Sequence, residues 1–240
     1  MNSAEQLLVS LLADHQITVN DRQLEQFAIY YRELVSWNEK MNLTGITELE
    51  QVYLKHFFDS LSLSFYVPLG EVSRLADIGS GAGFPSIPLK IMFPHLQVTI
   101  VDSLNKRIGF LTHLVKELGL ENVQCIHGRA EEVARQPEHR DRYDLVTARA
   151  VARLNVLNEF CLPFVRKGGL FAAMKGSDPT DEIQEARFSM KELKGEWMGD
   201  HRLTLPVEQA ERHILLIRKI ADTPRKYPRK PGTPLKTPLL

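Results

Sequence analysis

The 240-residue chain has only two cysteines, no long apolar run and no excess of either charge. Cys125 and Cys161 stand outside any CxxC or Cys/His spacing, so we expect reduced, buried thiols and no metal site. The stretch Leu7–Ala13 is too short to span a membrane and no basic segment precedes it, which predicts a cytoplasmic protein with no membrane partner. The thirty basic and thirty acidic side chains cancel, which argues against a general nucleic-acid coat.

The cancelled charge is unevenly distributed along the chain. Residues 1–67 carry 4 basic and 9 acidic side chains, residues 68–222 carry 21 of each, and residues 223–240 carry 5 basic and no acidic ones. We therefore expect three parts with these boundaries: an N-terminal helical cap, a larger central domain and a basic, proline-rich tail.

Helical spacing dominates the first part. Apolar stripes lie within residues 7–12 and 24–35, and Asn20 and Asp21 are the candidate caps for the second stripe. Thr47 with Glu50 three residues later predicts a capping box that opens a third helix.

The central part alternates short apolar runs with helical patterns. Five runs have the composition of buried strands: 74–78, 98–102, 123–126, 143–147 and 170–174. Helices are predicted at 87–93, 108–118, 154–162 and 179–193. This rhythm is typical of an α/β fold with a parallel sheet covered on both faces. Two later runs, 202–205 and 213–217, predict an antiparallel hairpin at one edge of the sheet.

The stretch DIGSGAGFP (Asp77–Pro85) lies between the first predicted strand and a helix. Glycines at alternate positions, Gly79, Gly81 and Gly83, allow a sharp turn and let a ligand approach the backbone closely. A dinucleotide fingerprint needs glycine where Phe84 stands, which disfavours a nicotinamide-dependent oxidoreductase. The remaining pattern, DxGxGxG, resembles the loop of class I S-adenosylmethionine (SAM) methyltransferases, although a plain connecting turn is the alternative.

Polar residues follow the next strands at their carboxyl ends, where ligands of open α/β sheets bind. Asp102 ends the second strand and can accept ribose hydroxyls. After the third strand, Ala130 and Glu131 are expected near an adenine edge. After the fourth, Arg149 can meet a SAM carboxylate or an RNA phosphate, whereas Arg153 is more simply a solvated charge.

Several motifs in a fixed order give a more specific resemblance. They are MNLTGIT (41–47), LKHFFDSL (54–61), LADIGSGAGFPSIPLKI (75–91), GRAEE (128–132), TARAVA (147–152) and MKG (174–176). Together they resemble the ribosomal RNA small-subunit methyltransferase G family, also called glucose-inhibited division protein B, over essentially the whole chain. The one visible departure is Ser86, where many relatives have glycine.

The resemblance implies a class I SAM-dependent methyltransferase with a Rossmann-like, mostly parallel seven-stranded sheet. It implies transfer of a methyl group to N7 of one guanine in bacterial 16S rRNA, alone or in the 30S subunit, and we expect a monomer. The implied SAM contacts are Gly79, Gly81, Phe84, Asp102, Ser103, Leu104, Ala130, Glu131 and Arg149. Candidate contacts to the substrate RNA are Asn42, Arg153, Lys175, Arg225, Lys226, Arg229 and Lys230.

The chemistry of guanine N7 agrees with what the sequence lacks. N7 has an in-plane lone pair and no proton, so its methylation needs no general base and no covalent nucleophile, and positioning can supply most of the rate. No two prolines are adjacent, so the motif used on exocyclic amines is absent, and neither cysteine has the context for attack on a pyrimidine. No catalytic residue in the narrow sense is therefore expected.

Other residues remain open to two readings. Asn42 either approaches the target base or caps a turn, and Phe84 either packs under the cofactor or anchors the core. His56 and Asp59 are one helical turn apart, which favours a hydrogen bond on the helix surface over a metal pair.

The last 18 residues contain five prolines among five basic side chains. We expect this tail to be extended or disordered and to bind rRNA phosphates, so that its deletion weakens RNA affinity while SAM binding survives. A non-enzymatic rRNA-binding factor is the remaining alternative to an enzyme, and methyl transfer tests it directly.

Overall fold

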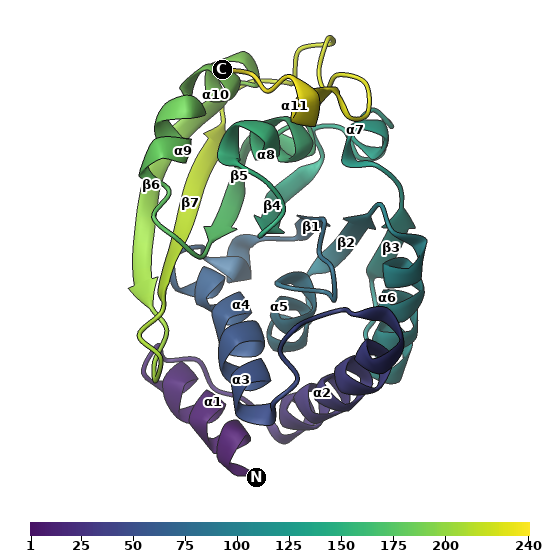
Figure 1. Cartoon of the computed structure of the whole chain (residues 1–240), viewed down its shortest axis with the longest axis vertical. Helices are drawn as coiled ribbons and strands as arrows, with labels where there is room; N and C mark the ends of the chain where they lie inside the picture. The colour runs from purple at the N-terminus through teal and green to yellow at the C-terminus, as the bar shows by residue number, and fades with distance from the viewer.

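The computed structural model describes all 240 residues and contains one seven-stranded sheet in the order β3-β2-β1-β4-β5-β7-β6 (Figure 1). Strands β1 to β5 are parallel, and β7 runs antiparallel to both β5 and β6. The strands are β1 (Arg74–Ile78), β2 (Gln97–Asp102), β3 (Val123–His127), β4 (Tyr143–Arg149), β5 (Val165–Lys175), β6 (Gly195–Thr204) and β7 (Glu211–Lys219). The predicted mostly parallel sheet with an antiparallel edge hairpin is confirmed.

Helices cover both faces of the sheet (Figure 1). One face carries α1 (Ser3–Ala13), α2 (Asp21–Met41), α3 (Leu49–Val52), α4 (Asp59–Leu61), α5 (Ser86–Met92) and α6 (Asn105–Glu117), with a π-helical stretch, Tyr53–Phe58, between α3 and α4. The other face carries α7 (Ala130–Val133), α8 (Leu154–Cys161), α9 (Thr180–Glu185), α10 (Arg187–Glu192) and α11 (Thr233–Lys236). None of these helices combines the length and apolar character needed to cross a membrane.

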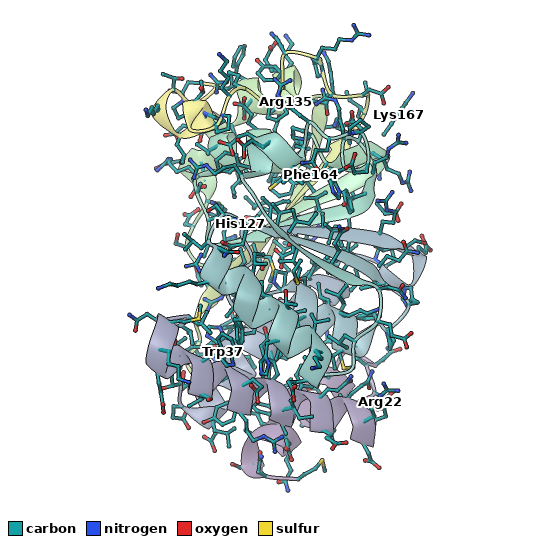
Figure 2. The ribbon with its side chains drawn as sticks, turned by 90° about the vertical axis from the view of Figure 1, so that its right-hand side faces the viewer. Arg22, Trp37, His127, Arg135, Phe164 and Lys167 are labelled. Carbon is teal, nitrogen blue, oxygen red and sulfur yellow. The ribbon has the colours of Figure 1, made fainter.

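Each face of the sheet has its own apolar cluster. A cluster of 35 buried residues joins the N-terminal helices to β1, β2, α5 and α6, and one of 24 joins β4 and β5 to α8 and α10. Trp37 on α2 faces α6, where its ring lies 5.6 Å from Phe110 and 5.2 Å from His113 (Figure 2). The N-terminal helices therefore form part of the core that supports the glycine loop.

Two local predictions were wrong. The predicted helix 179–193 is two short helices, which are separated by the buried residue Ala186. The third helix is capped by Glu48 and not by Thr47, because the Glu48 carboxylate accepts hydrogen bonds from the backbone N–H groups of Glu50 and Gln51. Of the two predicted cap candidates of α2, Asn20 is the cap and Asp21 is the first residue of the helix.

The expectation of an extended or disordered tail was also wrong. Residues 223–240 pack against α7 and α8, Tyr227 and Pro234 are buried, and a single helical turn, α11, follows Gly232. Proline does not prevent this turn, because Pro234 lies in its first positions, where the missing N–H would have no helical partner. Arg135 lies beneath this segment in Figure 2.

Candidate active site

The glycine loop begins where β1 ends. Gly79, Gly81 and Gly83 all have positive φ angles, of 73°, 61° and 100°. A Cβ atom at Gly83 would lie 2.8 Å from the Tyr30 hydroxyl and 2.9 Å from Ile87, whereas a Cβ at Gly81 would meet nothing within 4 Å. Gly83 is thus required by packing, and Gly81 leaves open space beside the backbone.

Asp77 lies buried beneath this loop. One of its carboxylate oxygens accepts a hydrogen bond from the backbone N–H of Ser86 at 3.2 Å, and the other has no partner. Burial is the main cause that raises the pKa of Asp77 from 3.8 to about 7. Ser86 is itself fully buried, so the serine that departs from the glycine of many relatives is accommodated inside the fold.

Asp102 is tied to the same loop from the end of β2. Its carboxylate accepts hydrogen bonds from the backbone N–H groups of Gly81 at 3.2 Å and of Leu104 at 2.9 Å. Arg107 forms an ion pair with it at 3.5 Å. The predicted ribose-binding carboxylate is therefore held beside the open space at Gly81 by three groups.

A first cavity, of about 180 Å³, lies at the carboxyl ends of β1, β2 and β3. Four of the predicted SAM contacts line it: Gly79, Ser103, Ala130 and Glu131. Its apolar walls include Ile78, Val101 and Phe160. This combination of apolar walls with backbone groups and the Glu131 carboxylate suits a nucleoside.

A second cavity, of about 250 Å³, lies at the ends of β4 and β5 against the N-terminal helices. Arg149, Lys175, Arg212, His56 and Asp59 contribute charged and polar groups to its wall. The segment from Arg149 to Val151 separates the two cavities, because Arg149 and Ala150 line the second and Val151 lines the first. Ala150 in this segment has a φ angle of 55°, which is uncommon for a residue with a side chain.

Arg149 is held by three groups from the N-terminal helices. Its guanidinium donates to the Lys55 carbonyl at 3.2 Å, to the Asp59 carboxylate at 3.0 Å and to Nδ1 of His56 at 3.2 Å. It also lies 4.9 Å from the centre of the Phe84 ring. The predicted hydrogen bond between His56 and Asp59 was wrong: the two side chains are buried and each binds Arg149.

This arrangement fixes the state of the His56 ring. Because an arginine can only donate, Nδ1 of His56 must accept, and Nε2 therefore carries the proton that it shares with the Thr44 hydroxyl at 2.8 Å. Burial, followed by the charge of Arg149, lowers the pKa of His56 from 6.5 to about 3. Two sequence motifs, one through Thr44 and the other through His56 and Asp59, thus converge on one arginine from a third.

The other predicted residues fall outside the first cavity. Phe84 is buried and stacks on His56 with ring centres 4.5 Å apart, so it anchors the core beneath Arg149. Asn42 caps the C-terminus of α2 in a left-handed conformation and does not line the second cavity. Arg153 is exposed and pairs with Glu185, whereas Lys175 does line the second cavity and binds Glu182.

Two functional candidates were not identified from the sequence. Arg212, on β7, lines the second cavity and lies 3.2 Å from the Asp59 carboxylate, and no motif marks it. Leu235, in the tail, lines the first cavity. The predicted pairing of the edge hairpin could have located Arg212, because β7 neighbours β5, but no local signal points to Leu235.

Comparison with known proteins identifies the family. A family model described as rRNA small subunit methyltransferase G matches residues 23–214. The chain belongs to this family. Ribosomal RNA small subunit methyltransferase G of Bacillus velezensis is 56% identical over 231 residues, which are 96% of this chain and 97% of the relative. The protein of the same name from Bacillus subtilis is 54% identical over 228 residues, 95% of each chain.

Solved structures of more distant proteins share the fold of this methyltransferase family member. A SAM-dependent O-methyltransferase from Thermotoga maritima superposes with a TM-score of 0.52 at 19% identity, covering 80% of this chain and 72% of that one. The [4+2]-cyclase SpnF superposes with a TM-score of 0.55 at 13% identity, covering 74% and 84%. Because one of these neighbours is a cyclase, the fold alone does not define the reaction.

Proposed function

We propose that this member of the methyltransferase G family transfers a methyl group from SAM to N7 of one guanine in small-subunit ribosomal RNA. The observation that carries the proposal is the pair of adjoining cavities divided by the segment from Arg149 to Val151. The first cavity is the proposed nucleoside site of the cofactor, and the second is the proposed site of the target base. The substrate partner is the 16S rRNA or the assembling 30S subunit, and the enzyme acts as a cytoplasmic monomer.

The residues of the first cavity fit SAM. Ile78, Val101 and Phe160 offer apolar surface to a purine ring. Asp102 is not in the wall of this cavity but lies at the end of β2 between its lining residues Val101 and Ser103, where its carboxylate can accept from ribose hydroxyls. The space beside Gly81 admits a ligand against the backbone, because no protein atom occupies the direction of a Cβ there. The cofactor, when bound, supplies an electrophilic methyl group on a sulfonium sulfur.

The protein's own contribution is positioning. Guanine N7 presents an in-plane lone pair with no proton to remove, so holding the base in line with the methyl group is sufficient chemistry. Arg149 supports this role because three acceptors and the Phe84 ring fix its guanidinium in the wall of the second cavity. His56 orients Arg149 as a neutral ring, since its pKa is lowered to about 3.

The acceptor side has donors that suit guanine. Arg212 and Lys175 line the second cavity and can donate to the O6 acceptor of a guanine edge, which leaves the lone pair of N7 free to receive the methyl group. Both are restrained by carboxylates, Arg212 by Asp59 at 3.2 Å and Lys175 by Glu182 at 2.6 Å. A restrained donor loses little freedom when the base binds, which favours one orientation of that base.

The experiment incubates the protein and SAM with 30S subunits from a strain that lacks this modification. N7-methylguanine is then mapped by chemical cleavage of the RNA at the modified base. We expect one new site with the unaltered protein and little or none with Asp102→Ala, while Asp181→Ala, on an exposed residue outside both cavities, serves as the matched control.

The outcomes separate the alternatives. No modified site with a folded protein would overturn the proposal and favour a non-enzymatic rRNA-binding factor. A methyl group on an exocyclic amine or on a ring carbon would retain the methyltransferase and refute guanine N7 as the acceptor.

A further inference from the structure

The tail is fastened to the body of the protein by a buried ion pair. Arg229 donates to both oxygens of the Glu159 carboxylate, through Nε at 3.0 Å to each and through Nη2 at 2.6 Å, and its backbone N–H donates to the same group at 2.7 Å. Glu159 lies on α8 and is 1% exposed. A carboxylate buried this deeply is strongly destabilising without its partner, so Arg229 is held in place.

Two further arginines bind the backbone of the same segment. Arg140 donates to the carbonyls of Thr223, Pro224 and Tyr227. Arg135 donates to the carbonyls of Lys226 and Pro228. Prolines offer no N–H for a regular ladder, and these guanidinium groups instead satisfy the carbonyl side of the segment.

Beyond this anchor, the chain reaches the first cavity. The backbone N–H of Gly232 donates to the Glu131 carboxylate at 2.8 Å, and Glu131 lines that cavity. Leu235 lines it as well, together with the sheet residues Ile78 and Val101, although Leu235 is 55% exposed. Leu235 is thus a large apolar side chain at the edge of an apolar cavity, where a ligand would remove it from water.

We infer that the tail is part of the cofactor site. Leu235 covers the purine side of the first cavity, and Gly232 fixes the Glu131 side chain in its wall. This inference rests on the proposed SAM-dependent function. It reverses the expectation from composition, in which the tail binds RNA and is dispensable for SAM.

The experiment measures the dissociation constant of S-adenosylhomocysteine by calorimetry for four full-length or nearly full-length chains. They are the unaltered protein, Leu235→Ala, a truncation after residue 230, and the control Leu240→Ala. We expect Leu235→Ala to weaken binding about tenfold, the truncation to weaken it more, and Leu240→Ala to bind normally. Leu240 is 72% exposed and does not line the cavity, so it controls for loss of an apolar side chain near the end.

A second measurement separates a cofactor contact from a general loss of stability. Thermal unfolding without ligand should be nearly unchanged in Leu235→Ala, because the side chain is half exposed, and S-adenosylhomocysteine should slow amide exchange at Gly232 in the unaltered chain. Equal affinities of the unaltered chain and Leu235→Ala would overturn the inference while leaving the proposed function intact. Loss of 16S rRNA affinity on truncation with unchanged S-adenosylhomocysteine affinity would overturn it in favour of an RNA arm. If the unaltered chain bound no S-adenosylhomocysteine, the proposed function would fail first and this inference with it.

Discussion

Gly81 and Gly83 occur in the same glycine loop, but only Gly83 is closely surrounded by other residues. Substitution by alanine should therefore affect stability and ligand binding differently at the two positions. At Gly81, with a φ of 61° and nothing within 4 Å of a Cβ, the substitution adds only backbone strain, about 1–2 kcal/mol. At Gly83, with a φ of 100°, the same strain is joined by contacts of 2.8 Å to Tyr30, 2.9 Å to Ile87 and 3.0 Å to Leu111.

The neighbours of Gly83 have little freedom to move. Tyr30, Ile87 and Leu111 are fully buried, and the Tyr30 hydroxyl is bound to the Ala82 carbonyl at 2.6 Å. Overpacking of this kind costs about 1–3 kcal/mol in addition to the strain. We therefore expect Gly83→Ala to lower the free energy of unfolding by about 2–5 kcal/mol, and Gly81→Ala by about 1–2 kcal/mol.

Urea unfolding followed by circular dichroism measures both values, and calorimetry with S-adenosylhomocysteine measures binding. Binding should show the reverse order: Gly81→Ala should lose at least tenfold in affinity, because its new methyl group enters the space beside Asp102, whereas the folded fraction of Gly83→Ala should bind almost normally. Equal stabilities of the two variants would refute the steric reasoning. Normal binding by Gly81→Ala would refute the placement of the ligand.

Three further predictions concern buried charges. Asp77 has its pKa raised to about 7 in the folded chain, so its ionisation destabilises the fold progressively between about pH 4 and pH 7. The free energy of unfolding of Asp77→Asn should exceed that of the unaltered protein by an amount that grows through this window to roughly 2–4 kcal/mol. A difference independent of pH would contradict the assignment. His56 has its pKa lowered to about 3, so its contribution is present above pH 6.5 and is lost as the pH falls; His56→Gln should lose less stability than the unaltered protein between pH 6.5 and pH 4, and parallel pH profiles would argue against a buried neutral ring. Arg149→Lys cannot serve all three acceptors of the guanidinium, so we expect a loss of about 1–3 kcal/mol by thermal unfolding and a decrease in methyl transfer of at least tenfold, with unchanged transfer excluding Arg149 from the positioning role.

The inner strands β1 and β2 were predictable because they are buried over nearly their whole length, so β1 was located to the residue and β2 to within one residue. The edge strand β3 is partly exposed and was also located to within one residue. The prediction stopped short of the end of β4, where Arg149 is charged, and of the start of β5, where the exposed residues 166–168 interrupt the apolar run. Helix starts depended on side-chain geometry: Asn20 and Thr47 are both plausible caps by type, but only the fold shows that Glu48 takes the position of the latter.

The residues of the candidate site could be predicted from the sequence, but the hydrogen bonds between them could not. Motif order marked Arg149, His56 and Asp59, yet the residue spacing suggested that the latter two bind each other. The hydrogen bonds from Arg149 to Asp59 and His56 join residues that are 90 and 93 positions apart, so no local sequence pattern could reveal them. Asp102 was located more easily, because the carboxyl end of a strand next to a glycine loop is a position with a known use.

The tail shows most clearly why composition is an incomplete guide. Prolines and unpaired basic residues indicate disorder only when the rest of the chain offers them no partner. Here α8 presents Glu159 and α10 presents Glu192, and these carboxylates pair with Arg229 and Lys226, respectively. Two of the five positive charges of the tail are therefore neutralised within the protein, while Arg225, Lys230 and Lys236 are exposed and form no ion pair. The separation of charge along the sequence is thus partly cancelled in three dimensions, and the same ion pairs that remove charge from a possible RNA contact hold the segment that brings Leu235 to the first cavity.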